Sequence, residues 1–536
     1  MVSLPSLHSP SQSPDQPRVS VCSAVFKLLR AFGMKTIFGN PGSTELPMFR
    51  AFPSDFRYIL GLQESIVVGM ADGFAQATRN AALVNLHSAA GLGHALGNVF
   101  TAFRNQTPLV ITAGQQARSI LPFQPFLFAE QATEFPKPYI KWSCEPARAE
   151  DVPAAIARAY YTAMQPPRGP TFVSIPVDDW ERDCVAIEPR EVSSVIVGDL
   201  GLLGQVSHAL NAARAPAFVV GAGVAREGVW DELISLAELH QALVWVSPMS
   251  ARNSFPEDHE LFAGFLPANR GGIVTALAGH DVIVVMGAPV FTYHVEGFGP
   301  HAPPGAQLFQ LTDDPVSATS CAVGVSVVTS LVPGVRELLR GGGGSGARPP
   351  PPKFERQPLL AMGALTDSYL LQQVTALRPP ESIIVEEAPS SRSAMHERLP
   401  MVNRDSFYTC ASGGLGHGLP AALGVALARP DKKVIAILGD GASLYAIQGL
   451  ATAGQLNLPV AFIVLNNRRY KALEEFGRHF GLADTIGTSL PNVDFCAIAR
   501  AQGCDAIRVR KPADLDAALQ AAFGASVPTL VEVEID

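Results

Sequence analysis

The sequence contains little charge for its length. Asp, Glu, Lys and Arg together make up only 16% of its 536 residues, and the formal net charge is −8. It has no concentrated basic patch, which argues against nucleic acid as a partner. No stretch has the unbroken apolar length of a membrane span. The first 18 residues, rich in serine and proline, lack the apolar core of a signal peptide and are expected to form a disordered tail.

Cysteine is also scarce. Seven cysteines, at positions 22, 144, 184, 321, 410, 496 and 504, are scattered without a CxxC pair. A disulfide framework or a zinc site is therefore not expected, and a reducing cytoplasm is the predicted location. Apolar residues, in contrast, make up 47% of the chain. This composition predicts large buried cores and, with so few charges, fits extensive contacts between subunits.

A chain of this length accommodates about three domains. Apolar strands alternate with helical periodicity over 19–185 and again over 186–340. A run of glycines followed by prolines over 341–356 predicts a linker, and 357–536 forms a third segment. Strands that end in loops followed by helices are typical of the α/β class, so we expect three doubly wound parallel-sheet domains.

The third segment carries a Gly-Asp-Gly motif centred on Asp440. The apolar run 432–438 before it predicts a buried strand, 442–456 predicts a helix, and 459–465 predicts a second strand that leads to Asn467. Both polar side chains would then lie at the carboxyl ends of parallel strands, where open α/β sheets bind ligands.

The residue types of this motif suit a metal-bound diphosphate. Asp440 and Asn467 offer hard oxygen donors, and Gly439 and Gly441 let the backbone approach a ligand closely. A lone Gly-Asp-Gly is weak evidence because Asp-Gly is common in turns. The whole strand–helix–strand unit at this spacing is much stronger, and it predicts a Mg²⁺ or Ca²⁺ site.

This unit resembles the cofactor-binding motif of the thiamine-diphosphate enzymes. The resemblance covers the chain from about Val19 to Glu534. It is closest to the thiamine-diphosphate-dependent 2-oxoacid decarboxylases that act on benzoylformate. The matching runs are Phe38–Ser43, Leu62–Glu64, Asn85–Gly91, Gly287–His294 and Gly413–Gly416.

The resemblance implies a lyase that converts benzoylformate to benzaldehyde and CO₂ through an adduct and an enamine on the thiazolium ring, as in mandelate catabolism. It implies thiamine diphosphate and Mg²⁺ as cofactors, with Ca²⁺ able to substitute. The first segment would bind the pyrimidine, the third the diphosphate, and the second would be a middle domain. Because the family binds its cofactor between two subunits, a homotetramer with shared sites is implied.

Glu64 illustrates how the resemblance changes an interpretation. Alone, it is a carboxylate at the start of the helical stretch 65–78, where the helix dipole would stabilise it by about 0.3–1 kcal/mol. Within the resemblance, it matches the carboxylate that hydrogen-bonds N1′ of the cofactor. Proton sharing there favours the imino form, so that the cofactor acts as its own base.

Other positions match the cofactor and metal contacts of the family. Leu415, otherwise an ordinary core leucine, matches the residue that wedges under the cofactor. Ala442 replaces an expected hydroxyl residue, and Ser443 is the alternative source of that contact. The metal would be held by Asp440, Asn467 and the main-chain oxygen of Arg469. The implied cofactor-binding residues are Asn40, Pro41, Glu64, Gly413, Leu415, Gly439, Asp440, Gly441, Ala442, Ser443, Asn467 and Tyr470.

Ser43, His87 and His294 match substrate-handling residues. Individually, a serine in a Pro-Gly turn and a histidine after a strand are usually structural. The resemblance implies that Ser43 binds the substrate carboxylate and that His87 transfers protons around the adduct. It implies that His294 helps to protonate the enamine and release the aldehyde. Imidazole suits proton transfer because it titrates near neutral pH.

The size of the substrate would be set by six apolar positions. Phe126 stands where the family has a leucine, and Pro389 where it has a threonine, so the aryl slot differs from that of the family. One methylene in such a pocket changes substrate preference by about 1–3 kcal/mol. The predicted pocket consists of Phe126, Leu127, Pro389, Ala472, Leu473 and Phe476.

Five alternative functions differ from this interpretation. Gly221-Ala222-Gly223 lacks the full dinucleotide fingerprint, which argues against NAD binding. Ser43 lies outside a nucleophile elbow, which argues against an acyl hydrolase. A carboligase of the acetolactate-synthase type, or a decarboxylase of another 2-oxoacid, would keep the same cofactor. A non-catalytic interaction module would not need intact Glu64, Asp440 and Asn467.

Overall fold

The computed structural model describes residues 17–343, 357–360 and 363–535. The predicted tail lies outside these residues except at its end, where the prediction is wrong: Arg18 already begins strand β1 (Arg18–Ser20). This strand pairs antiparallel with β8 (Asp183–Val185), and the Arg18 guanidinium donates to the Asp183 carbonyl. Of the predicted linker, 341–356, the structure describes only 341–343, and the rest lies outside the described residues.

The first segment forms a six-stranded parallel sheet. Its strands, in sheet order, are β3 (Arg57–Leu60), β2 (Thr36–Gly39), β4 (Ala82–Leu86), β5 (Leu109–Gln115), β7 (Pro170–Pro176) and β6 (Ser143–Cys144). Its helices are α1 (Val21–Ala31), α2 (Leu46–Phe49), α3 (Glu64–Thr78), α4 (Ser88–Asn105) and α5 (Val152–Met164), with short turns η1 (Leu121–Phe123) and η2 (Ala149–Asp151). The central strands are continuous apolar runs because helices cover both faces.

The third segment repeats this topology. Numbered along each segment, the strands of both sheets follow the order 2-1-3-4-6-5. The strands, in sheet order, are β16 (Phe407–Tyr408), β15 (Ile383–Glu387), β17 (Val434–Gly439), β18 (Ala461–Asn466), β20 (Thr529–Glu534) and β19 (Asp505–Val509). The helices are α12 (Asp367–Leu377), η3 (Pro389–Ser391), α13 (Arg392–Arg398), α14 (Gly418–Ala428), α15 (Asp440–Tyr445), α16 (Gly449–Leu456), α17 (Lys471–His479), α18 (Phe495–Ala501) and α19 (Pro512–Gly524).

The middle segment has the order 3-2-1-4-5-6 of the dinucleotide-binding fold. Its strands, in sheet order, are β11 (Phe262–Phe265), β10 (Leu243–Val246), β9 (Pro216–Val220), β12 (Val282–Met286), β13 (Gln307–Thr312) and β14 (Val325–Val328). Its helices are α6 (Leu200–Ala212), α7 (Gly223–Glu227), α8 (Trp230–His240), α9 (Arg270–Ala276), α10 (Pro315–Thr319) and α11 (Leu331–Arg340). The prediction of three parallel-sheet α/β units is therefore confirmed.

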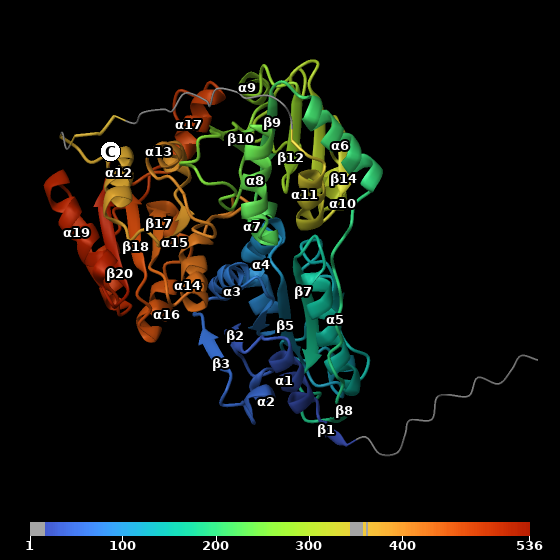
Figure 1. Cartoon of the computed structure of the whole chain (residues 1–536). Coiled ribbons are helices and arrows are strands. Elements are labelled where there is room, and N and C mark those ends of the chain that lie inside the picture. The colour runs from blue at the N-terminus through green and yellow to red at the C-terminus, as the bar shows by residue number, and fades with distance from the viewer. Residues whose placement is uncertain (1–16, 344–356, 361–362, 536) are drawn as a thin grey trace, which may run out of the picture.

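The first and third segments meet through two helices. Figure 1 shows α3 and α14 side by side between the two sheets. Glycines make this approach possible: a Cβ at Gly424 would lie 1.9 Å from the Met70 carbonyl oxygen, and one at Gly73 would lie 2.2 Å from that of Ala421. The helices consequently share one apolar core, which joins the two segments.

One predicted helix is interrupted. The stretch 442–456 forms two helices, α15 and α16, separated by three residues, and the first begins earlier, at Asp440. Ala446 ends α15 outside helical geometry, with φ −139° and ψ 22°. Leu444 and Ile447 both pack on the core, so the apolar pattern of the sequence continues through the break between the helices. Periodicity therefore does not reveal it.

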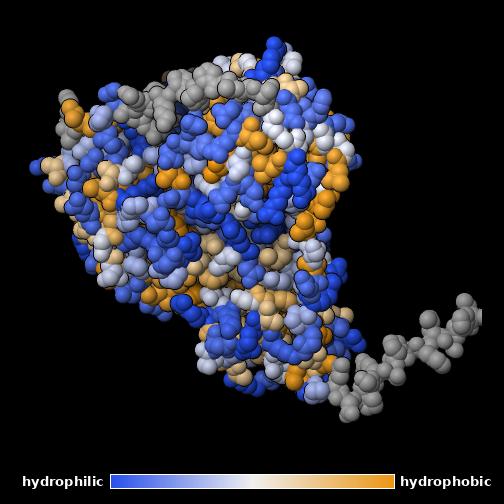
Figure 2. Space-filling view, in the orientation of Figure 1, coloured by the Kyte–Doolittle hydropathy of each residue, from blue (hydrophilic) through white to orange (hydrophobic). Residues whose placement is uncertain are grey.

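The scarcity of charge does not leave a broadly apolar exterior. Figure 2 shows a face that is mainly hydrophilic, with apolar residues in small groups. The apolar majority is instead concentrated in buried clusters on both faces of each sheet. Among the described residues, no helix combines the length and the apolar character that crossing a bilayer requires.

Candidate active site

A cavity of about 550 Å³ opens where β15, β17 and β18 end. Its sheet changes winding direction between β15 and β17, and such switch points are where open α/β sheets bind ligands. Most predicted site residues of the third segment line this cavity, and His294 of the middle segment joins them. These residues are His294, Pro389, Gly413, Leu415, Gly439, Asp440, Gly441, Ala442, Asn467, Arg469, Tyr470, Ala472, Leu473 and Phe476.

Asp440 lies buried at the start of α15. Its carboxylate accepts hydrogen bonds from the backbone N–H of Gly441 at 2.7 Å and of Arg468 at 2.6 Å. Burial raises the pKa of Asp440, although these and neighbouring backbone amides oppose the shift. In the part of the chain that the structure describes, no basic side chain forms an ion pair with it. A buried carboxylate without a countercharge is well suited to a divalent cation.

The turn after β18 brings Asn467 beside Asp440. Asn467 Oδ1 accepts from the Arg469 N–H at 3.1 Å, and Arg468 adopts a positive φ of 59°. The Tyr470 N–H donates to the Thr488 carbonyl, which fixes the far side of the turn. The three predicted metal ligands, Asp440, Asn467 and Arg469, therefore all line one cavity.

A carboxylate that the sequence did not indicate supports the loop of Leu415. Glu387, at the end of β15, accepts hydrogen bonds from the N–H groups of Gly416, His417 and Gly418 at 2.7–3.2 Å. Burial raises the pKa of Glu387 to about 7. In the sequence, two adjacent acidic residues at 386–387 in an otherwise apolar strand were a sign that a carboxylate is buried there. These bonds hold Leu415 at the cavity wall.

Ser443 is not among the residues that line the cavity. It is fully buried, and its hydroxyl donates to the Gly439 carbonyl at 2.8 Å within the first turn of α15. The hydroxyl proton is thus donated within the chain, and the contact of Ser443 with the diphosphate stays a prediction. Gly441 instead shows why glycine is needed here: a Cβ would lie 2.3 Å from the Tyr470 ring.

The mouth of the cavity is aromatic. The His294 and Phe476 rings meet edge to face, with centroids 4.7 Å apart. His294 follows β12, and its N–H donates to the Ala268 carbonyl. Pro389 begins the turn after β15, and α17 supplies Phe476 together with Ala472. One cavity therefore combines an imidazole, an apolar slot and a potential metal site.

The first segment holds a second group of predicted residues. Glu64 is the first residue of α3, and its carboxylate accepts a hydrogen bond from Asn40 Nδ2 at 3.2 Å. Gly91 on α4 lies against this carboxylate. Pro41, next to Asn40, is exposed. Glu64 thus lies where two loops and two helices converge.

His87 belongs to the same group and is held by a residue that was not predicted. Its Nδ1 lies 2.9 Å from Glu45 Oε2 and 3.0 Å from Thr44 Oγ1. Glu45 is buried and also accepts from the Gly114 N–H. Ser43, just before Thr44, is exposed. Glu45 fixes the imidazole ring, but its position in a turn gives no local sign of this contact.

Within one chain, the two groups do not line the same cavity. Glu64, Ser43 and His87 are absent from the lining of the 550 Å³ cavity, and so are Phe126 and Leu127 of the predicted pocket. Phe126 is 88% exposed. The cavity of a single chain therefore contains only one half of the predicted site.

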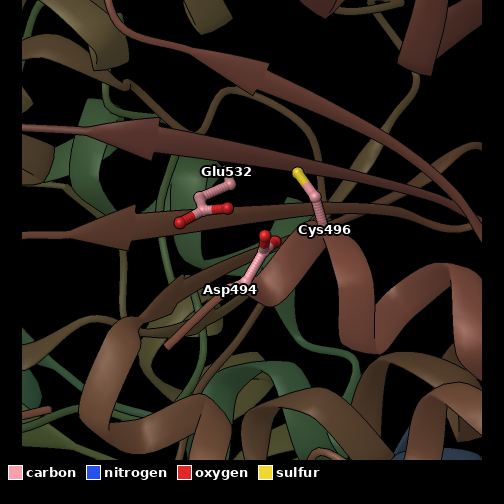
Figure 3. A group of neighbouring side chains, drawn as sticks. All are labelled: Asp494, Cys496 and Glu532. Carbon is pink, nitrogen blue, oxygen red and sulfur yellow. The ribbon is translucent and has the colours of Figure 1, made fainter. Parts of the chain in front are cut away.

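Figure 3 shows another cluster with the side-chain types of metal ligands: Cys496 on α18, Asp494 at the N-cap of this helix and Glu532 on β20. Arg508 lies between the two carboxylates: it donates to Glu532 Oε2 at 2.9 Å and also bonds Asp494. Burial, with Glu532 nearby, raises the pKa of the Cys496 thiol to about 11. A protonated thiol and two arginine-paired carboxylates are poor metal ligands, so we interpret this cluster as an ion-pair network.

Comparison with known proteins agrees with this arrangement. Models of the thiamine pyrophosphate enzymes match three parts of the chain: the N-terminal TPP binding domain at 19–133, the central domain at 203–338 and the C-terminal TPP binding domain at 390–533. The chain belongs to the thiamine pyrophosphate enzymes. The predicted resemblance is thereby confirmed.

Relatives within this enzyme family include benzoylformate decarboxylase of Pseudomonas aeruginosa, 42% identical over 96% of this chain and 98% of the relative. The acetolactate synthase large subunit of Haemophilus influenzae is 26% identical over 94% of this chain and 92% of the relative. Among solved structures, benzoylformate decarboxylase from Polynucleobacter necessarius superposes with a TM-score of 0.94 at 38% identity, covering 96% of this chain and 98% of that one. The 4-hydroxybenzoylformate decarboxylase of Rhodococcus jostii has a TM-score of 0.93 at 38% identity, covering 97% and 99%.

Proposed function

We propose that this enzyme catalyses the non-oxidative decarboxylation of an aromatic 2-oxoacid, with benzoylformate as the preferred substrate and benzaldehyde and CO₂ as products. The observation that carries the proposal is the single cavity that combines Asp440 and Asn467 with His294 and the aromatic slot at Phe476. The names of two similar proteins, one in sequence and one in structure, specify the same substrate. Oxidation of mandelate would supply this substrate.

The cofactors would be thiamine diphosphate and Mg²⁺, for which Ca²⁺ can substitute. Asp440 and Asn467 would hold the metal together with the Arg469 carbonyl, because oxygen ligands suit hard cations. The backbone around Gly441 and the wedge of Leu415 would position the cofactor. When bound, thiamine diphosphate supplies the ring that accepts the electron pair released with CO₂.

The protein side chains would handle the substrate and its protons. Ser43 would bind the carboxylate of the 2-oxoacid. His87, oriented by Glu45, would transfer the proton of the substrate oxygen, since a second group fixes its ring. His294 would deliver a proton to the carbon from which CO₂ has left. The slot at Phe476 would exclude water from the aryl group.

A screen of 2-oxoacids tests this function. With thiamine diphosphate and Mg²⁺ present, we expect kcat/KM for CO₂ release to be at least about tenfold higher with benzoylformate than with pyruvate. The reason is that the slot at Phe476 can contact the aromatic ring of benzoylformate, which pyruvate lacks. Product analysis by chromatography should identify benzaldehyde. Asp440→Asn serves as the inactive control. Acetolactate or benzoin as the main product would favour the carboligase alternative, and equal rates with pyruvate would contradict the aromatic preference.

We also propose that the active site is shared between subunits of a homotetramer. Exposed apolar side chains flank both halves of the predicted site. They are Leu46, Leu62, Phe123 and Phe126 in the first segment, and Leu473, Phe480 and Ile486 in the third. Such groups mark surfaces that a partner covers.

All seven cysteines are free thiols, which fits a reducing compartment such as the cytoplasm.

Mixing two inactive variants tests the shared site. Glu64→Gln and Asp440→Asn each inactivate one half, so a mixed dimer would contain one intact site. After random subunit exchange, about a quarter of all sites should be intact, and decarboxylase activity should recover to that extent. Exchange itself is verified with differently tagged subunits. Verified exchange without recovery would show that each site is built from a single chain.

A further inference from the structure

His94 is a histidine outside the predicted site that contacts its central carboxylate. Its Nδ1 lies 3.2 Å from Glu64 Oε2, while Asn40 Nδ2 lies 3.2 Å from Glu64 Oε1. Each carboxylate oxygen of Glu64 therefore has one side-chain partner. The Glu64 side chain is 11% exposed and the His94 side chain 65%. The imidazole thus lies between the buried carboxylate and the surface.

The position of His94 on α4 is fixed by its neighbours. Gly91, His94, Asn98 and Thr101 recur at helical spacing and form one stripe toward α3. A Cβ at Gly91 would lie 3.2 Å from Glu64 Oε1. Asn98 Nδ2 donates to the Ser65 carbonyl at 2.8 Å and to the Gly416 carbonyl at 3.1 Å. The stripe therefore places the His94 imidazole beside α3. Asn98, on the same stripe, connects α4 to the loop of Leu415.

Two donors constrain a carboxylate more than one does. A glutamate side chain has several rotatable bonds, and a single hydrogen bond leaves the carboxylate free to turn about it. Bonds to both oxygens fix its plane, while a carboxylate accepts up to about four hydrogen bonds in total. Lone pairs on Glu64 consequently remain for a further partner in a fixed direction.

We propose that His94 is a positioning residue for Glu64: its Nδ1–H holds Oε2, so that the carboxylate is presented to the aminopyrimidine of thiamine diphosphate in one orientation. This inference rests on the proposed role of Glu64 within the proposed function. It adds a residue that acts through Glu64 and touches neither the substrate nor the reacting atoms.

Three substitutions at one position test the assignment of the atom. In asparagine, the amide nitrogen is the same number of bonds from Cβ as Nδ1 of histidine. In glutamine, the amide nitrogen is one bond further away. His94→Asn should therefore preserve the bond to Glu64 Oε2, whereas His94→Gln and His94→Ala should lose it. Since the His94 side chain is largely exposed, all three variants are expected to fold normally.

The measurements are the affinity for thiamine diphosphate in the presence of Mg²⁺, by calorimetry, and the rate of C2-proton exchange of the bound cofactor, by NMR. We expect His94→Ala and His94→Gln to lower both by about tenfold, the effect of one charge-assisted hydrogen bond. His94→Asn should stay within about twofold of the parent. His208→Ala, an exposed histidine on α6, is the matched control.

The pattern separates this inference from the proposed function. Rescue by asparagine alone supports the assignment to Nδ1. Equal behaviour of all variants and the parent would overturn it, and so would equal losses in all three variants. If the parent binds thiamine diphosphate but decarboxylates no 2-oxoacid, the proposed function fails, and the affinities of the variants still decide the role of His94.

Discussion

Replacing Glu64 by glutamine is expected to slow C2-proton exchange of bound thiamine diphosphate by about 10²–10⁴-fold, the range for loss of a positioned proton-transfer group. Glutamine keeps the shape and can still meet Asn40, so the fold of α3 should not change. What is lost is a carboxyl group that shares a proton with the pyrimidine. NMR after rapid acid quench measures the exchange rate directly.

The control for this substitution lies in the same segment. Glu134→Gln removes an exposed carboxylate that pairs with Lys137 on the surface, and it should leave exchange unchanged. An exchange rate in Glu64→Gln equal to that of the parent would remove the role assigned to this carboxylate. Decarboxylation should fall with exchange, because both depend on the same proton.

The buried strands could be predicted because their sequences are unbroken. The runs around β17 and β18 are apolar over their whole length, and glycine and asparagine end them, so the place of Asp440 and Asn467 followed directly. The order of the strands within each sheet could not be predicted from these runs. That the first and third segments share one order depends on pairings between distant strands, which no local pattern records.

The supporting residues of the site were missed for a related reason. Glu45, His94 and Glu387 act through contacts with residues that are 29 or more positions away in the chain, except where Glu45 meets its own turn. Each is locally an ordinary residue of a turn, a helix or a strand. Their function becomes visible only when helices α3 and α4 and the loop of Leu415 converge.

The absence of Glu64 from the cavity follows from no local pattern in the sequence, and only the resemblance, through sites shared between subunits, implied it. Motifs identify both halves of the site, but a motif does not state the distance between them. In one chain the predicted residues of the first segment do not line the cavity, and apolar side chains are exposed beside each half, Ile486 at 97% among them. If the site is shared as proposed, the assembly is the unit in which the chemistry would operate.

Asp72 and His417 form the buried ion pair that joins the first and third segments. Their side chains are at most 1% exposed, and His417 Nε2 lies 2.5 Å from Asp72 Oδ2. Asp72 also accepts from Gln76 and Asn105. Burial opposes both charges, yet the pair prevails: Asp72 raises the pKa of His417, and His417 lowers the pKa of Asp72.

The pH dependence of this contribution follows from the two directions. A raised histidine pKa stabilises the fold fully below its ordinary value of 6.5, and this stability is lost as pH rises through the folded-state pKa. A lowered aspartate pKa stabilises the fold above its ordinary value of 3.8, and this is lost as pH falls through the folded-state pKa. The pair should therefore contribute most between these two values.

His417→Phe is expected to cost about 3–5 kcal/mol of unfolding free energy, because it leaves the Asp72 carboxylate buried without its countercharge. Phenylalanine retains most of the ring volume, so little of the loss is due to a cavity. Adding Asp72→Asn should recover part of the stability, since no unpaired charge then remains. Denaturant titration at pH 6 measures His417→Phe, Asp72→Asn and the double variant.

The matched control is an exposed pair. Glu337→Gln breaks the contact with Arg340 on α11 and should cost less than about 1 kcal/mol. If His417→Phe cost no more than this control, or if Asp72→Asn added its full loss to that of His417→Phe, the two side chains would not act as a pair. The junction of α3 and α14 would then depend on its glycine contacts and shared apolar core, and the loop of Leu415 would be held by Glu387 and Asn98.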